Sequence, residues 1–341
     1  MRIFLTILFA MNFLSSFGQN KKIDEILEKS YEFTMISNGD NVPNFYPTKD
    51  SIPEILVLLH NKVDITKIAN YFGWTDNKLK IKIDFLIDAN FIKLNNQDIY
   101  VPNVFICSIK ESEGIKLKSK KIISETIKSI QKSIPSIKTE VAKIKSFENF
   151  DFENLSLLIL SDVLLDNWQI ENVEKEFLKT KRTERHSKNY YASYQQKLKK
   201  NFHEPLGIYG NQYEDTLSFS ICRYGNTRYT KEVISKNEQL KKDYIINPKS
   251  FKYPVIDNLD YLKLQKIADN YKPELIKILN NYKTELLKGY ENSSYSDEIS
   301  FEEYFIWLYH IYYTEVTNEL IKQRLITIPK EKVAFYILTN N

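Results

Sequence analysis

The clearest periodic pattern begins near residue 52, where apolar residues recur at helical spacing. Three consecutive stretches, residues 52–61, 64–72 and 75–87, each place their apolar side chains on one helical face and predict three helices. After residue 90 the period changes to two, and apolar residues alternate with polar ones on both sides of a turn at 95–98. This change predicts a β-hairpin after the third helix.

Three helices followed by a hairpin make residues 52–106 resemble a winged helix-turn-helix module. The resemblance is carried by Ala69, which is small where two helices cross, by Gly73 in the turn, and by the wing from Phe91 to Val101. In that family the third helix enters the major groove of DNA. The resemblance therefore implies that the exposed side chains of the third helix would face DNA: Asn77, Lys78, Lys80 and Lys82.

Two observations argue against DNA reading by this segment. Asp76 and Asp84 lie on the same helix and would repel phosphate. The resemblance also rests on a packing pattern, and a fold by itself does not determine a function. We therefore expect a scaffold or protein-contact role for residues 52–106, with DNA binding as the alternative.

Residues 108–150 are rich in lysine and serine. Ten lysines stand against four glutamates between residues 110 and 145. One helical stripe collects four isoleucines: Ile123, Ile127, Ile130 and Ile134. We expect a solvated amphipathic helix here, and an anion-binding arm is the alternative.

Residues 151–245 predict a mixed section. Helical spacing continues to residue 177, and strands are expected at 190–194, 206–209 and 216–224. The triplet Tyr-Gly-Asn follows the second and the third of these strands. Because glycine and asparagine tolerate positive φ, the repeated triplet indicates two equivalent turns rather than a binding loop.

Residues 246–341 are helical up to their last part. Ser300 and Glu303 form a capping box that opens a long aromatic helix, residues 301–323, for which deep burial is expected. The apolar positions of residues 320–335 align without gaps with those of residues 86–101, the end of the third predicted helix and its wing. It predicts a terminal β-hairpin over residues 325–335 and, on the same ground, a second winged-helix-like module.

These patterns define a fold class and an order of segments. We expect a mostly helical α+β protein with a winged-helix-like N-terminal module, a central mixed α/β section and a C-terminal helical section that ends in a hairpin. The expected order is a signal peptide at 1–18, a polar lead-in at 19–50, the winged-helix-like module at 51–107, a lysine-rich linker helix at 108–150, the mixed section at 151–245 and the helical section at 246–341.

Residues 1–18 have the pattern of a cleavable secretory signal peptide. Arg2 provides a positive start, residues 3–14 are mostly apolar, and Ser16 to Gly18 offers a small-x-small cleavage pattern. The apolar run is shorter than the roughly 20 residues that span a bilayer. We expect cleavage near Gly18, a mature chain that begins at Gln19 without a transmembrane segment, and a periplasmic or secreted product.

Composition narrows the partners. The chain has 48 basic and 44 acidic residues, a balance that by itself indicates neither a nucleic-acid nor a membrane partner. Hydrophobic residues make up 43% of the chain, enough for packed cores. Cys107 and Cys222 both lie in apolar runs, so we expect two buried thiols without a disulfide, although an oxidising compartment permits a bridge.

Common catalytic motifs are missing from the sequence, which has no Gly-rich phosphate loop, paired-cysteine zinc motif, HExxH or GxSxG. We therefore expect no metal site and no cofactor. The candidate for catalysis is His310 with Glu303, seven residues earlier on the same helical face. Such a pair can act as acid and base. The alternative is a hydrogen-bonded core histidine in an aromatic helix.

A basic and tyrosine-rich segment, residues 179–200, is the candidate for binding. Basic side chains interleaved with aromatic rings can bind anionic polymers, and the rings can stack on sugars. The alternative is a solvated connection that leads into a strand. Strand alternation would place one tyrosine of the pair at 190–191 in the core and the other outward beside the cations. The ligand-binding candidates are Arg182, Arg185, His186, Lys188, Tyr190 and Tyr191.

Taken together, the sequence favours an exported envelope or secreted protein with a non-enzymatic binding role. Its partner would be an anionic envelope ligand or another protein. The first alternative is an envelope hydrolase that uses groups near His186 or His310. The second is a DNA-binding regulator, which requires that the chain is not exported.

Overall fold

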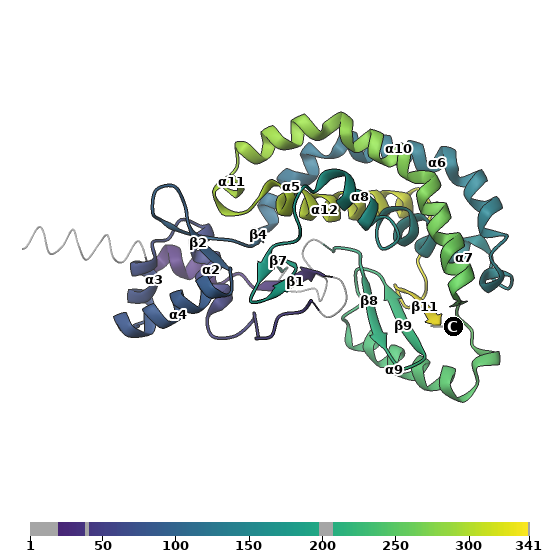
Figure 1. The fold of residues 1–341 in the computed structure, drawn as a ribbon, viewed down its shortest axis with the longest axis horizontal. Helices are drawn as coiled ribbons and strands as arrows, with labels where there is room; N and C mark the ends of the chain where they lie inside the picture. Colours follow the sequence, from purple (N-terminus) through teal and green to yellow (C-terminus); the bar gives the residue numbers. More distant parts are fainter. Residues whose placement is uncertain (1–19, 38–40, 198–206, 340–341) are drawn as a thin grey trace, which may run out of the picture. The chain divides into compact units, whose positions relative to one another are not determined.

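A computed structural model describes residues 20–37, 41–197 and 207–339. It shows a mostly helical α+β protein with several small sheets, so the predicted fold class is confirmed (Figure 1). The predicted signal peptide, residues 1–18, lies outside the described residues. The described chain forms two compact units. Unit 1 takes its parts from Met1–Ile109, Lys181–Lys200 and Gly289–Tyr304, and unit 2 from Lys110–Thr180, Asn201–Lys288 and Phe305–Asn341.

Three helices of unit 1 lie where the apolar periodicity predicts them: α2 Ile52–His60, α3 Ile65–Tyr71 and α4 Asp76–Asp88. Asp64 caps α3 by accepting a hydrogen bond from the backbone N–H of Thr66 (2.8 Å), and Thr75 caps α4 in the same way. Such caps satisfy backbone donors that a helix start leaves free. Gly73, between α3 and α4, has a φ of +62°, which glycine adopts without strain.

Two small sheets complete the core of unit 1. The hairpin predicted after α4 consists of β2 Ile92–Leu94 and β3 Tyr100–Pro102, which pair antiparallel. A second sheet has the order β1–β7–β4, with β1 Tyr31–Ile36, β7 Tyr191–Gln196 and β4 Phe105–Cys107. Helices and strands bury their apolar faces in one core, whose members include Ile23, Leu56, Leu86, Phe91 and Tyr194.

The central strand β7 is buried on both faces. It pairs with β1 on one side and with β4 on the other, and Tyr190 and Tyr191 are only 0% and 1% exposed. The prediction that one of these two tyrosines points outward beside the cations is therefore wrong. It assumed a sheet with one face in water, whereas a strand covered on both faces has no solvated side.

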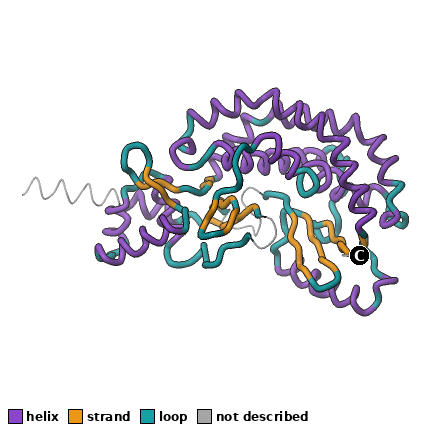
Figure 2. Tube along the Cα trace, in the orientation of Figure 1, coloured by secondary structure: helices purple, strands orange, loops and turns teal. Residues whose placement is uncertain are grey.

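Helices make up most of unit 2 (Figure 2). The helices that lie wholly or mostly in unit 2 are α5 Ile109–Lys118, α6 Lys120–Val141, α7 Phe152–Leu157, α8 Ile170–Phe177, α9 Lys231–Ile246, α10 Asn258–Glu291 and α12 Phe301–Lys322. The last residues of α10 and the first turn of α12, with Glu303, belong to unit 1. The amphipathic helix predicted in the lysine-rich segment is α6, in which Ile123, Ile127 and Ile130 are buried. The expected deep burial of the aromatic helix is also found, since Trp307, Tyr309 and Tyr313 of α12 are at most 2% exposed.

The sheet of unit 2 has the order β10–β11–β9–β8. Its strands are β8 Asn211–Asp215, β9 Phe219–Tyr224, β10 Val255–Ile256 and β11 Ala334–Thr339. Val233 and Leu240 of α9 pack against Phe219, Ile221 and Phe335 of the sheet, so α9 covers one sheet face (Figure 1). Leu206, where a strand was expected to begin, lies outside the described residues, and β8 starts only at Asn211.

The predicted terminal hairpin does not form. Residues 325–333 contain no strand, and β11 pairs with β9 and β10 instead of folding back on its own helix end. The residues of β11 are apolar without alternation from Ala334 to Leu338. A continuous apolar run suits a buried central strand better than a wing with one wet face.

Cys107 in β4 and Cys222 in β9 are both buried and form no disulfide, as predicted. Their thiols lie near the backbone carbonyl oxygens of Ser108 (3.5 Å) and Ser220 (3.8 Å). No helix within the described ranges is long and apolar enough to cross a membrane.

Candidate functional site

A groove on the surface of unit 2 is the candidate site. It has a volume of about 750 Å³ and is lined by residues of α5, α6 and α12. Small-molecule sites in proteins usually measure between about 300 and 1,000 Å³, so the groove is large enough for a small ligand.

The helical repeat explains why particular side chains share this groove. Side chains at positions i and i+4 lie one above the other on one helical face, so each long helix presents a row of polar groups. The row on α6 is Lys120, Ser124 and Lys128. The row on α12 is Glu315 and Glu319, continued by Gln323 directly after the helix end. The apolar lining comes from Ile123 and Ile127, which are 8% and 7% exposed.

Two polar bridges connect α12 to the other helices of the groove. The Nζ atom of Lys116 on α5 lies 2.8 Å from Oε1 of Glu315. The side-chain amide of Gln131 on α6 donates a hydrogen bond to Oε1 of Gln323 (2.7 Å). These bridges link α12 to both of the other helices that line the groove.

Two lysines of the groove have no ion-pair partner among the described residues. Glu319 forms an ion pair with Lys322 (2.5 Å), so both glutamates of the α12 row have cationic partners within unit 2. Lys120 and Lys128 are exposed and form no ion pair with any described residue. The third glutamate of the lining, Glu113, lies on α5. The α6 side of the groove is therefore positive.

The sequence analysis predicted one side of this groove, the α6 side. The spacing of lysines and isoleucines in residues 108–150 predicted an amphipathic helix, with an anion-binding arm as the alternative. The α12 row was missed, because its glutamates lie almost two hundred residues further along the chain and had no visible partner. The one sequence signal for this row is the helical spacing of Glu315, Glu319 and Gln323, which places them on one helical face.

Arg185, one of the predicted binding residues, is fully buried in unit 1. Its guanidinium donates to both carboxylate oxygens of Glu303 (2.7 and 2.8 Å) and to the backbone carbonyl oxygens of Asn90 (2.9 Å) and Asn103 (2.7 Å). The ring of Phe91 lies 5.7 Å from its Cζ atom. The expectation that Arg185 faces solvent is therefore wrong, because an internal carboxylate and two internal carbonyls hold its guanidinium.

The other candidates of this segment do not form one exposed basic face beside the two buried tyrosines. His186 lies in the turn of a short hairpin, β5 Glu184–Arg185 and β6 Lys188–Asn189, with a φ of 51°. Its Nδ1 atom lies 3.5 Å from a carboxylate oxygen of Asp88. Arg182 and Lys188 are half-buried, and each has an interaction partner.

His310 is 7% exposed and lies among the aromatic rings of α12. Its Nδ1 atom is 2.8 Å from the backbone carbonyl oxygen of Ile306, one helical turn earlier. The rings of Tyr313 and Trp307 are 5.1 and 5.9 Å away. These contacts fit the alternative of a hydrogen-bonded core histidine.

Glu303 is engaged by other groups of unit 1. Besides the Arg185 contact, it accepts hydrogen bonds from the hydroxyl of Thr183 (2.9 Å) and the backbone N–H of Ala192 (3.2 Å). Its own backbone N–H donates to the hydroxyl of Ser300 (3.1 Å), which is one half of the predicted capping box. The carboxylate itself is held by the buried arginine.

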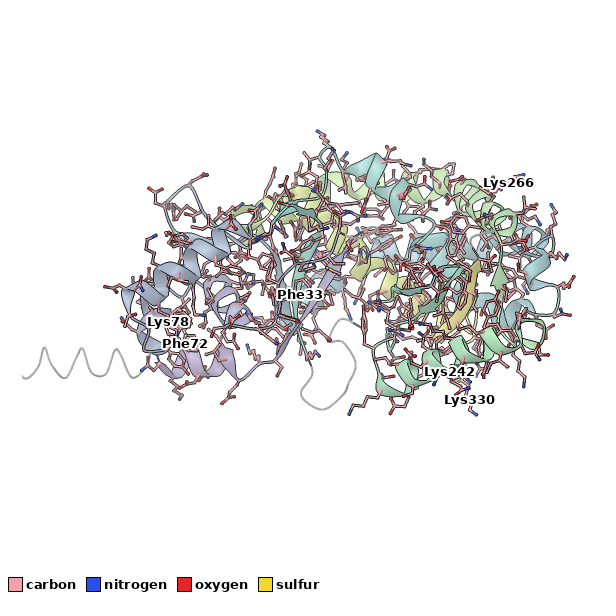
Figure 3. The ribbon with its side chains drawn as sticks, turned by 60° about the horizontal axis from the view of Figure 1, so that its bottom comes forward. Phe33, Phe72, Lys78, Lys242, Lys266 and Lys330 are labelled. Carbon is pink, nitrogen blue, oxygen red and sulfur yellow. The ribbon has the colours of Figure 1, made fainter. Side chains whose placement is uncertain are left out.

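The lysines of α4, which the winged-helix resemblance would direct toward DNA, are partly occupied by neighbours. Lys80 pairs with Asp84 (2.6 Å). Lys82 donates to a backbone carbonyl (2.5 Å), and its Nζ atom lies 5.0 Å from the ring centre of Trp74. Lys78 lies 5.8 Å from the same ring centre, and the ring of Phe72 stacks on Trp74 (4.8 Å); Figure 3 labels Lys78 and Phe72.

Fold and site together define a mostly helical α+β protein with a charged surface groove. Within the described ranges, no three potential metal ligands of the His, Cys, Asp or Glu type come together. No family model matches the chain, and no curated protein or solved structure matches it either. The function is therefore argued from the groove itself.

Proposed function

We propose that this chain is an exported, non-enzymatic binding protein that holds an anionic ligand in the groove of α5, α6 and α12. The observation that carries the proposal is the pair of exposed lysines, Lys120 and Lys128, beside an apolar lining. Ammonium groups without an internal partner are available to a carboxylate or a phosphate, and such charge-assisted hydrogen bonds are among the strongest in proteins.

The spacing of the two lysines limits the form of the ligand. They are eight residues apart on one helix, which corresponds to roughly 12 Å along its axis. The hydroxyl of Ser124 lies between them in the row, and Ile123 and Ile127 offer an apolar contact. A ligand that joins one anionic group to a short apolar chain can contact a lysine and the isoleucines together.

Export is the second part of the proposal and rests on the pattern of residues 1–18. An envelope or secreted protein meets anionic glycans and lipids, which carry the charge that the groove would accept. The three helices and hairpin within residues 52–106 would then serve as a scaffold or a protein contact.

Binding is better supported than hydrolysis. A hydrolytic site needs a nucleophile or a general base that faces a cavity. His310 directs one ring nitrogen at a backbone carbonyl, and His186 lies in a hairpin turn beside Asp88. Neither histidine lines the groove.

The test uses octyl phosphate as the probe, titrated into the mature full-length protein by calorimetry. We expect saturable binding that the double substitution Lys120→Ala/Lys128→Ala weakens roughly 5- to 30-fold. Binding should fall as salt is added, because the contacts are exposed and therefore screened.

A matched control removes the same charge from the same helix. Lys121→Ala/Lys132→Ala changes two exposed lysines of α6 that do not line the groove. This variant should bind as the wild type does, and octyl glucoside, which lacks the charge, should bind weakly. Equal loss of octyl phosphate binding in both double variants, or no binding by the wild type, would overturn the proposal.

A further inference from the structure

A closed ring of three polar contacts lies in the core of unit 2. Asp162 sits in a π-helix, Leu158–Val163, which continues from α7. The side-chain amide of Asn211 on β8 lies 2.6 Å from Oδ1 of Asp162. The hydroxyl of Tyr336 on β11 lies 3.1 Å from Oδ2 of Asp162 and 3.1 Å from Oδ1 of Asn211. The three side chains therefore close a ring that joins one helix to two strands.

A count of protons determines the state of this ring. Three contacts require three donated protons. The amide of Asn211 supplies one, because only one of its two polar atoms is a donor, and the hydroxyl of Tyr336 supplies one. Reversing the amide of Asn211 leaves this count unchanged. An ionised carboxylate only accepts, so a proton on Asp162 would give each of the three contacts its own donor.

We propose that Asp162 is a protonated carboxylic acid in the folded protein, and that the ring is a pH-sensitive latch between the π-helix and strands β8 and β11. While the proton is present, Asp162 donates to Tyr336, Tyr336 donates to Asn211, and Asn211 donates to Asp162. When the proton leaves, Tyr336 donates to Asp162 instead. The oxygen atoms of Tyr336 and Asn211 then face each other without a proton between them, and Asp162 carries a buried charge. The latch is then weakened, because burial penalises the charge on Asp162 even though donors remain, and because the contact between Tyr336 and Asn211 has lost its proton. π-Helical turns often mark functional positions, which is consistent with a switch at this place.

The surroundings of Asp162 favour the neutral form. Burial, followed by the neighbouring Asp166, raises the pKa of Asp162, against hydrogen bonds from the side chains of Asn211 and Tyr336 and from the backbone of Asn167, which lower it. Burial also raises the pKa of Asp166 to about 7, against the hydroxyl of Tyr313 and the charge of Arg228. The titratable groups that act on Asp162 or are acted on by it are Asp166, Tyr213, Cys222, Tyr224, Tyr261 and Tyr336. Tyr213 and Cys222 also form hydrogen bonds with the Tyr336 hydroxyl.

The sign of the pH effect follows from these directions. In the unfolded chain the carboxyl ionises near its ordinary value of 3.8, whereas in the fold it stays neutral to a higher pH. Between these two values the folded state binds more protons than the unfolded state, so stability falls as the pH rises. Asp166 contributes in the same direction between 3.8 and about 7.

The decisive variant is Asp162→Asn. Asparagine has the shape of the protonated acid and supplies the same third proton, so the introduced side-chain amide would donate to Tyr336 and complete the ring at every pH. We expect urea unfolding of this variant to match the wild type near pH 4 and to be more stable than the wild type near pH 8. A one-proton difference corresponds to a tenfold change in the unfolding equilibrium constant per pH unit within the window. Asp162→Ala should destabilise unit 2 at both pH values, because it leaves Asn211 and Tyr336 without partners.

The exposed Asp151→Asn, at the start of α7, is the matched control and should leave the pH dependence unchanged. A measurement on the wild type guards against a variant that fails to fold. Carbon-13 NMR of the aspartate carboxyl groups should show Asp162 still protonated at pH 6. Titration of Asp162 near 3.8, or equal destabilisation by Asp162→Asn at pH 4 and pH 8, would overturn the proposal.

Discussion

At the scale of single residues, the buried pair of Arg185 and Glu303 is a main determinant of unit 1. Hydrogen-bond donors of this unit converge on one carboxylate from Arg185, Thr183 and the backbone of Ala192. Moving both charges out of water is expensive, so the pair by itself adds little net stability. Removing one partner strongly destabilises the fold, because the remaining charge stays buried without its counter-ion.

We predict that Glu303→Gln lowers the free energy of unfolding by about 3 to 5 kcal/mol, since it leaves the Arg185 guanidinium uncompensated. Urea denaturation followed by circular dichroism measures the effect. The neighbouring Glu302, which is half-exposed on the same helix, provides the control. Glu302→Gln should change the free energy by less than about 0.5 kcal/mol. Equal effects of the two substitutions would show that the buried pair is not critical for the fold.

At the scale of secondary-structure elements, the two Tyr-Gly-Asn triplets lie at the end of the β8–β9 pair opposite its connection at residues 216–218. Residues 209–211 lead into β8, and residues 224–226 follow β9, its antiparallel neighbour. The backbone N–H of Gly225 donates to the carbonyl oxygen of Gly210 (3.2 Å). The two triplets therefore lie side by side at one end of the β8–β9 pair. A Cβ atom at Gly225 would lie 2.6 Å from Cγ1 of Val333, so the second glycine is required by close packing.

This close approach makes a second prediction about stability. Gly225→Ala should lower the free energy of unfolding by roughly 1 to 3 kcal/mol, because the added methyl group overpacks the contact with Val333. Gly114→Ala in α5 is the matched control, since nothing lies within 4 Å of its Cβ position. That substitution should raise stability by up to about 1 kcal/mol through helix propensity. Thermal unfolding of the two variants measures both effects. A Gly225→Ala variant as stable as Gly114→Ala would contradict the packing argument.

At the scale of the whole molecule, the chain is expected to work after removal of its first segment. We predict that the native protein begins at or near Gln19, because residues 1–18 have the three parts of a signal peptide. N-terminal sequencing of protein recovered from cell fractions measures this directly. Recovery of the intact Met1 form from the cytosol would end the export part of the proposed function, while the groove experiment would still test the binding part.

The sequence by itself determined the elements whose formation depends on near neighbours. Apolar spacing located α2, α3, α4 and the β2–β3 hairpin, and it located α6 and α12 with their buried faces. Helix and hairpin patterns are local, because their periods of 3.6 and 2 repeat within a few residues. The composition likewise indicated packed cores and two buried thiols.

Only the tertiary structure decided which of these elements meet. Arg185 and Glu303 are separated by 118 positions, and Gln131 and Gln323 by 192, and no local pattern connects either pair. The same holds for β11, which leaves its own helix end to pair with β9, and for β7, which is covered on both faces. A basic side chain looks the same in sequence whether it faces water or a buried carboxylate. Its surroundings are set by long-range packing, and for that reason the lysines of α6 became the candidate site and Arg185 became part of the core.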